Sequence, residues 1–178
     1  MAKMKKALAA LRYIVPSDME YFLEEQAAEG WKLEHLGEMS LFYFSFEEGP
    51  GETAKFIVDV TALPKAVYLQ TGIEKGWEFM GKTGNCYVWR QVYKDKRPED
   101  FTDKACRKKH CTRMGVGALL FALLCLGAAI ALFYGAYIDV TMGESKHCIA
   151  YIVEGILQLP LVAYLSWAAH KLLGAGKR

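Results

Sequence analysis

GVGALLFALLCLGAAIALFYGAYI, residues 115–138, decides the fold, because these 24 consecutive residues contain no Asp, Glu, Lys, Arg or His. At about 1.5 Å per residue, a helix of this length rises about 36 Å, which exceeds the roughly 30 Å of a bilayer's hydrocarbon core. Residues 148–169 form a second apolar run, interrupted by Glu154, Gln158 and Pro160. The sequence therefore predicts a two-helix transmembrane hairpin that follows a mixed, charged N-terminal half.

The apolar runs divide the chain into segments. We expect a soluble domain over residues 1–100, a basic linker over 101–114, spans over 115–138 and 148–169, a loop over 139–147 and a tail over 170–178. Basic residues are retained on the cytoplasmic side of a membrane. The loop holds one of them, Lys146, whereas five crowd the linker: Lys104, Arg107, Lys108, Lys109 and Arg113. This asymmetry predicts a two-pass protein of the inner or plasma membrane, with both termini and the domain in the cytoplasm.

The formal net charge of +2 is unevenly distributed. Residues 1–100 carry 13 basic and 16 acidic side chains, whereas the five basic residues of the linker are accompanied by Asp103 alone. Anionic headgroups attract each juxtamembrane Lys or Arg by about 1 kcal/mol, so the basic linker residues are also candidate lipid-headgroup ligands. An acidic domain argues against nucleic acid as a partner, because such binding depends on neutralising phosphates.

The soluble half contains an internal repeat, marked by Gly30-Trp31 and Gly76-Trp77, which lie 46 residues apart. Each copy is predicted to be strand–helix–strand–strand, over about residues 10–48 and 53–95, with first strands at residues 12–15 and 56–60. Such spacing is typical of a duplicated supersecondary unit. We therefore predict an α+β fold: a duplicated βαββ unit that forms a mainly antiparallel sheet of about six strands, with two helices on one face.

The first helix of the repeat is predicted over residues 17–30. Ser17 is a suitable N-cap, and Glu20, three residues later, would complete a capping box. An apolar stripe at helical spacing indicates the buried face. The opposite face is predicted to be solvated and carries Glu20, Glu24, Glu25 and Glu29.

Aromatic residues alternate along the last strand of each repeat, which leaves these strands apolar on both sides. Aromatic side chains with a polar handle are typical of contact surfaces. The candidates for a surface that binds a protein partner are Tyr43, Tyr87, Trp89 and Tyr93. The alternative is that loops, the N-terminal leader or the membrane-proximal segment cover this sheet face.

The soluble half contains few candidate catalytic residues. His35 is its only histidine and Cys86 its only cysteine, and no catalytic triad, phosphate loop or metal-ligand spacing is present. Asp59 is interpreted as a turn-capping carboxylate, and Arg90 is expected to pair with it across the sheet. We therefore expect no catalytic, cofactor or metal site, and no enzymatic activity.

Polar residues inside the second span need an explanation, because a carboxylate in hydrocarbon costs several kcal/mol unless it is protonated, paired or hydrated. Glu154 and Gln158 lie one helical turn apart, and we expect them to face the first span, another protomer or a partner. The alternative is a glutamate near enough to the interface to reach water. In the first span, Gly127, Ala131 and Gly135 favour close helix packing, either within the hairpin or in a homodimer.

Several motifs together resemble one known family: EYFLEEQAAEGWKL (residues 20–33), FYF (42–44), FIVD (56–59), GWE (76–78) and YVWR (87–90). They are similar to the domain-of-unknown-function family 2812 (DUF2812), over about residues 8–95. Phe22 replaces the family's usual Trp, and the strand before Asp59 lacks its usual Tyr-Arg. In this family a helical-hairpin anchor commonly follows. The genes often neighbour those of PadR-type transcriptional regulators, so the resemblance implies a membrane-linked regulatory or sensing role, and it implies no catalytic residue.

Two functions remain open. The first is a non-enzymatic, membrane-anchored sensor or adaptor, whose cytoplasmic domain presents an aromatic sheet face to an unidentified protein partner. The second is an accessory or scaffold subunit of a transporter or other membrane complex, in which the hairpin makes the main contact. An enzyme that acts on a lipid or nucleotide has no support beyond isolated carboxylates.

Overall fold

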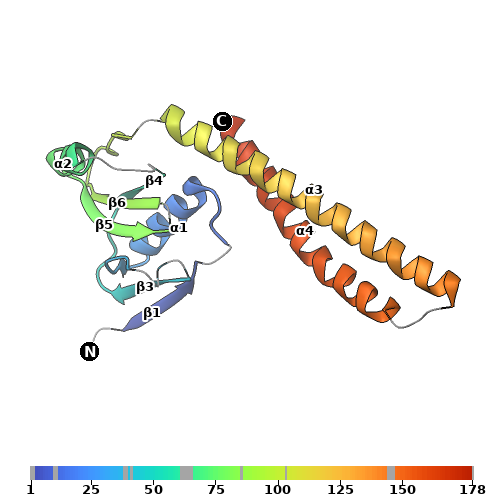
Figure 1. The fold of residues 1–178 in the computed structure, drawn as a ribbon. Helices are drawn as coiled ribbons and strands as arrows, with labels where there is room; N and C mark the ends of the chain where they lie inside the picture. The colour runs from blue at the N-terminus through green and yellow to red at the C-terminus, as the bar shows by residue number, and fades with distance from the viewer. Residues whose placement is uncertain are drawn as a thin grey trace. The chain divides into compact units, whose positions relative to one another are not determined.

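The computed structural model describes residues 3–9, 12–37, 40, 42–60, 66–84, 86–102, 104–143 and 147–177, and the chain forms two compact units, Met1–Arg107 and Lys108–Arg178. The described elements are β1 (Met4–Leu8), α1 (Pro16–Ala28), β2 (Trp31–Leu33), β3 (Tyr43–Glu48), β4 (Ala54–Asp59), α2 (Ala66–Glu74), β5 (Glu78–Thr83), β6 (Cys86–Val92), α3 (Lys104–Met142) and α4 (Cys148–Lys177) (Figure 1). The order β–α–β–β occurs twice. The predicted α+β class and duplicated unit are therefore confirmed.

The first strand lies earlier than predicted, at Met4–Leu8 rather than at residues 12–15. It pairs with β3 over five residues, from Met4 opposite Glu47 to Leu8 opposite Tyr43. The described residues 12–15 belong to the connection into α1. Pro16 is placed in the first turn of that helix, where its missing N–H has no helical partner to lose.

The strands form two three-stranded antiparallel sheets instead of one larger sheet. Sheet A has the order β1-β3-β2 and sheet B the order β4-β6-β5. A parallel bridge between Leu36 and Gly81 joins them, and the Leu36 N–H donates to the Met80 carbonyl at 2.7 Å. A Cβ at position 81 would overlap the Leu36 carbonyl, so glycine permits this close approach.

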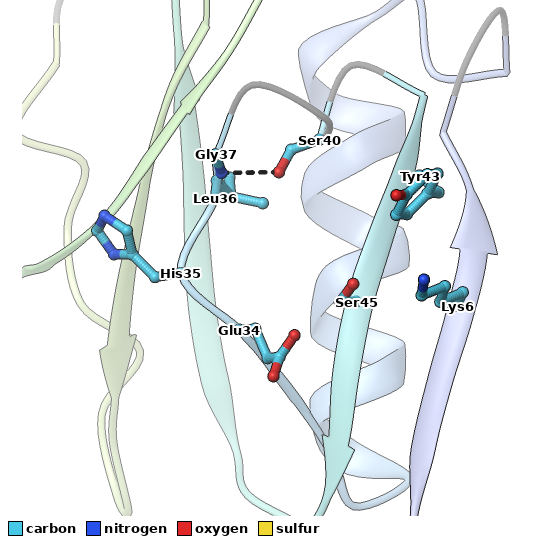
Figure 2. A pocket seen from close by; sticks show the side chains of 8 residues that line it. All are labelled: Lys6, Glu34, His35, Leu36, Gly37, Ser40, Tyr43 and Ser45. Carbon is cyan, nitrogen blue, oxygen red and sulfur yellow. Dashed lines mark hydrogen bonds between the residues drawn. The ribbon is translucent and has the colours of Figure 1, made fainter.

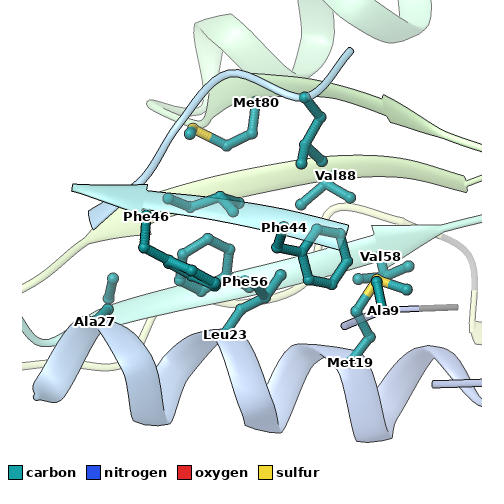
Figure 3. Packing of buried hydrophobic residues seen from close by; sticks show 13 residues of the cluster. Ala9, Met19, Leu23, Ala27, Phe44, Phe46, Phe56, Val58, Met80 and Val88 are labelled. Carbon is teal, nitrogen blue, oxygen red and sulfur yellow. The ribbon is translucent and has the colours of Figure 1, made fainter. Parts of the chain in front are cut away.

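The main hydrophobic core lies where α1 meets the inner faces of both sheets (Figure 3). Leu23 of α1, Phe44 and Phe46 of β3, and Phe56 and Val58 of β4 are all at most 2% exposed. Burying each such side chain contributes about 1.5–3 kcal/mol. The predicted apolar stripe of the first helix is therefore its core face.

A second cluster covers the opposite face of sheet B. Ile57, Trp77 and Trp89 are buried there, packed against Tyr68 of α2 and against Phe101. Alternate residues of β4 thus enter the two clusters, and all six β4 residues are buried. Because both faces of this strand need a cover, α1 and α2 pack on opposite faces of sheet B. The expectation that both helices lie on one face is corrected here.

The second unit is a hairpin of α3 and α4, each long and apolar enough to cross a membrane. Small residues are buried at every seventh position of α3, namely Gly115, Ala122, Ala129 and Ala136. Buried residues recur at multiples of seven in α4 too, at Cys148, Gly155, Ala169 and Gly176. A seven-residue period keeps one seam of each helix facing its partner, as in a left-handed coiled coil.

This seam differs from the small-residue stripe predicted from the sequence. Gly127 and Ala131 are exposed, and a Cβ at Gly127 would meet nothing within 4 Å. Gly135 does approach α4, since a Cβ there would lie 3.5 Å from the Tyr151 ring. Four-residue spacing follows one helix face for only a few turns, so it diverges from the seven-residue seam that packs.

Candidate functional site

The outer edge of β4 is bound by two carboxylates of α1. The Val58 N–H donates to Glu20 Oε1 at 2.9 Å, and the Phe56 N–H donates to Glu24 Oε1 at 3.3 Å. These are the amides that point away from β6, because the neighbouring odd-numbered residues of β4 bond to that strand. Edge-strand amides left open would invite pairing with other chains. Here α1 occupies them.

The sequence prediction for these glutamates was wrong. The Glu20 and Glu24 side chains are only 17% and 18% exposed, so they do not form a solvated face. The predicted capping box is also not formed, since Val15 occupies the N-cap position without a side-chain hydrogen bond. Glu20 therefore points to β4 rather than back to its own helix terminus.

Two arginines from the segment after β6 bind the same carboxylates. Arg97 Nη2 lies 2.8 Å from Glu24 Oε1, and Arg107 Nη1, in the first turn of α3, lies 2.5 Å from Glu20 Oε1. Lys55 of β4 also forms an ion pair with Asp100 and donates to the Pro98 carbonyl at 2.6 Å. We call residues 93–107 the connecting segment. Ion pairs link this segment to α1 and β4.

These ion pairs change the interpretation of the basic linker. Arg107 was a candidate for binding lipid headgroups, but its guanidinium contacts Glu20 and lies 4.0 Å from Asp100. Lys108, Lys109 and Arg113 are exposed, as that role requires. The side chain of Lys104 lies outside the described part of the structure.

Burial is the main influence on the pKa of the Glu20 carboxyl. It raises the pKa of this carboxyl above the usual value of 4.5, while the Val58 N–H and the Arg107 guanidinium oppose the shift. The carboxylate is thus held at a desolvated position by one backbone donor and one charged donor. Loss of either donor would leave a buried acceptor with less compensation.

A half-buried tyrosine connects α2 to sheet B. The Tyr68 hydroxyl donates to Asp59 Oδ2 at 2.6 Å and accepts from Trp89 Nε1 at 3.1 Å. Burial, followed by the bond to Asp59, raises the pKa of Tyr68. Arg90 was predicted to pair with Asp59, but it forms ion pairs with Glu52 and Glu78 instead. Phe56 and Asp59 differ by an odd number along β4, so Arg90, opposite Phe56, projects from the other face.

The predicted partner surface is divided by the structure. Trp89 is 0% exposed beneath α2, so it cannot be part of a contact surface. Tyr87 and Tyr93 are half-buried, and Tyr87 packs beside Tyr68. Tyr43 lies on sheet A, away from these three residues in the pairing. The alternation of aromatic residues could not show which sheet face α2 would cover.

Tyr43 is half-buried too, but it belongs to a sheet face whose β1 residues Met4 and Leu8 are exposed. Met4, Lys6 and Leu8 of β1 share the outer face of sheet A with Tyr43, Ser45 and Glu47 of β3, opposite the face that packs on α1. Figure 2 shows Lys6, Tyr43 and Ser45 on this face. Leu8 is 66% exposed and lies opposite Tyr43. The Lys6 ammonium lies 4.8 Å from the Tyr43 ring centroid, within the range of a cation–π contact.

A hollow of about 220 Å³ adjoins this face. The Gly37 N–H donates to Ser40 Oγ at 2.9 Å, and the Thr83 hydroxyl donates to the Ser40 carbonyl at 2.9 Å, which fixes one wall. The hollow is lined by Lys6, Glu34, His35, Leu36, Gly37, Ser40, Tyr43 and Ser45 (Figure 2). Sequence reasoning missed it, because its residues come from three separate segments of the first repeat.

The polar residues of the hairpin also line a groove, of about 560 Å³. Glu154 and Gln158 of α4 face it, as does Asp139 of α3, which the sequence analysis did not select. Among the described residues, no group of three His, Cys, Asp or Glu side chains is placed to hold a metal ion.

The fold and these sites define a small duplicated α+β domain joined to two apolar helices. The family model described as "Protein of unknown function (DUF2812)" matches residues 16–125. This match covers more than half of the chain and extends from α1 into α3, so the chain belongs to that family. Comparisons with curated proteins and with solved structures each gave no match.

Proposed function

We propose that this chain is a membrane-anchored sensor or adaptor that acts through protein–protein contact and catalyses no reaction. The observation that carries the proposal is the attachment of the connecting segment. Arg107, in the first turn of α3, and Arg97 both bind carboxylates that hold the edge of β4. A displacement of the first turn of α3 would therefore act directly on β4 and on the core that this strand shares with β3.

The contact surface in this proposal is the outer face of sheet A. It combines exposed apolar area at Met4 and Leu8 with the Tyr43 ring that the Lys6 ammonium contacts, and aromatic residues and methionine are enriched at protein interfaces. The adjoining hollow offers polar groups from Glu34, His35 and Ser40 to a partner's side chain. This surface replaces the wider set of aromatic residues expected from the sequence.

A second function, an accessory subunit of a transporter or other membrane complex, is favoured by the hairpin groove. Glu154, Gln158 and Asp139 line it, and polar groups within membrane spans are typical of functional contacts. In that case the hairpin makes the main contact and the domain is a scaffold.

Variants of the full chain in its native membrane separate the two functions. If sheet A binds the partner, Leu8→Glu and Tyr43→Ala should reduce a chemically cross-linked adduct at least tenfold. Tyr21→Ala, at a 70% exposed position of α1, is the matched control and should leave the adduct intact. Loss of the adduct on Glu154→Leu, with no effect of the sheet variants, would support the accessory subunit instead.

We also propose that the domain and both termini are cytoplasmic in a two-pass plasma- or inner-membrane protein. The support is the basic residues that precede the first span and their scarcity in the loop. Met142→Cys, at the exposed end of α3, should react with an impermeant maleimide added from outside, whereas Cys106 should react only after permeabilisation. The reverse pattern would contradict this orientation.

A further inference from the structure

The groove between α3 and α4 has the size of a small-molecule site. Its volume of about 560 Å³ lies within the roughly 300–1,000 Å³ typical of ligand pockets. Apolar residues of α3 form one wall, including Leu132 and Ile138, and Tyr151 of α4 stands opposite. All of its lining residues belong to the hairpin unit.

The acidic side chains of the two helices converge on this groove. Within Lys104–Met142 and Cys148–Lys177 the sequence contains two acidic residues, Asp139 and Glu154, and both line it. Gln158, one turn beyond Glu154, lines it too, and none of the nine lining residues is basic. An apolar groove with two carboxylates and no basic lining residue is electrostatically suited to a cation.

Two oxygen atoms in the groove have no hydrogen-bond partner. Asp139 Oδ2 and Gln158 Oε1 are both buried, and neither meets a donor among the described residues. Leaving a buried acceptor unsatisfied is unfavourable, and more so when the group is charged. Because the apolar residues that line the groove supply no side-chain donor, these acceptors are placed where a positively charged group would compensate them.

We propose that this groove binds a lipophilic organic cation, a single positive charge carried on an apolar body. Asp139 and Glu154 pair with the charge, while Leu132, Ile138 and the Tyr151 ring contact the apolar part. A bare inorganic cation would leave the apolar wall without a contact. This site does not depend on the proposed sensor or adaptor role of the soluble domain.

Tetraphenylphosphonium is a suitable probe, and tetraphenylborate is its control, with the same shape and the opposite charge. The full chain in phosphatidylcholine nanodiscs should bind tetraphenylphosphonium saturably at one site in equilibrium dialysis, above the signal of empty nanodiscs. Tetraphenylborate should show no saturable binding. The variant Asp139→Asn/Glu154→Gln should raise the Kd for tetraphenylphosphonium at least tenfold, while Glu99→Gln, exposed in the soluble half, should leave it unchanged.

The comparison of the two ions on the unmodified chain needs no variant, so a folding defect cannot obscure it. The proposal is overturned if tetraphenylphosphonium binds no better than to empty nanodiscs, if tetraphenylborate binds equally well, or if the double variant retains full affinity. A dimer in nanodiscs that becomes monomeric in the double variant, without binding of the probe, would identify a second copy of the chain as the occupant.

Discussion

The Glu20 carboxylate of α1 accepts a hydrogen bond from the backbone N–H of Val58 in β4 at 2.9 Å. Glu24, one helical turn later, accepts from Phe56, two residues earlier in the strand. Four residues of helix rise about 6 Å, and two residues of strand rise about 6.6 Å. These two rises are nearly equal. A helix that runs antiparallel to an edge strand can therefore place acceptors beside successive outward-pointing amides of that strand.

Removing the Glu20 carboxylate should destabilise the edge of β4. Glu20→Ala is expected to lower the free energy of unfolding by about 1–3 kcal/mol, because it leaves the Val58 N–H and the Arg107 guanidinium without their partner. Hydrogen exchange of the β4 peptide, measured on the full chain in detergent, should accelerate. Glu25→Ala, exposed on the same helix, should change stability by less than about 0.5 kcal/mol. Equal effects of the two variants would contradict the assigned contact.

Stability should also depend on the ionisation of Glu20. Its pKa is raised above 4.5 in the folded chain, so just above that pH the folded state binds a proton that the unfolded state does not. This group therefore adds stability as the pH falls through its folded pKa, and that contribution is lost as the pH rises. Glu20→Gln should remove this part of the pH dependence of Tm in the range just above pH 4.5. An unchanged difference in Tm between wild type and variant across that range would refute it.

Tyr68→Phe tests the half-buried hydroxyl that connects α2 to sheet B. The change removes the donor to Asp59 and the acceptor of Trp89 Nε1, while it preserves the ring that packs on Trp89. We expect a loss of about 1–3 kcal/mol in urea unfolding, together with a shift of tryptophan fluorescence. Tyr21→Phe, at an exposed site, is the control. Similar unfolding midpoints for both variants would show that the hydroxyl contributes little.

Trp89→Ala and Tyr43→Ala should differ in their effect on thermal stability. Trp89 fills the second cluster, so its truncation should cost about 3–5 kcal/mol and lower Tm strongly. Tyr43 lies on the accessible outer face of sheet A, so its truncation should leave Tm almost unchanged. Thermal unfolding of the full chain in detergent measures both. A large destabilisation by Tyr43→Ala would mean that this residue is structural.

Packing in the hairpin can be tested at its seven-residue seam. Ala129→Leu should force α3 and α4 apart, because Ala129 is 1% exposed within the seam. Gly127→Leu adds a larger side chain at a position where a Cβ meets no neighbour within 4 Å, so it should be tolerated. Resistance of the hairpin to unfolding in mixed detergent micelles should fall only for Ala129→Leu. Equal loss in both variants would argue against the seam.

The apolar runs and the Gly-Trp repeat could be read from the sequence because each is a local pattern. Residues 115–138 exclude charge over a whole span, and Gly30 and Gly76 both adopt positive φ at the end of a helical segment. The heptad of small residues in α3 is also a local pattern, but the Gly127–Ala131–Gly135 spacing predicts a different packing face. Of the two spacings, only the seven-residue one keeps a single seam facing the partner helix along the whole of α3.

The role of Glu20 and Glu24 could not be predicted in the same way. On the helix they lie beside solvent-facing residues, and only the tertiary position of β4 turns them into buried acceptors. Trp89 shows the same limit, since strand alternation gives two apolar faces without saying which one α2 covers. The groove could not be predicted either, because its lining comes from two helices. Asp139 became a candidate site residue only once the structure placed it in the same groove as Glu154.

Site-specific photocross-linking in the native membrane tests the proposed function most directly. A benzophenone side chain at position 43 places the reactive group on the outer face of sheet A, and the same group at position 21 on α1 is the control. A single cross-linked product from position 43, without one from position 21, is the result that the sensor or adaptor function predicts. No product from position 43, together with one from position 154, would contradict it and assign the main contact to the hairpin.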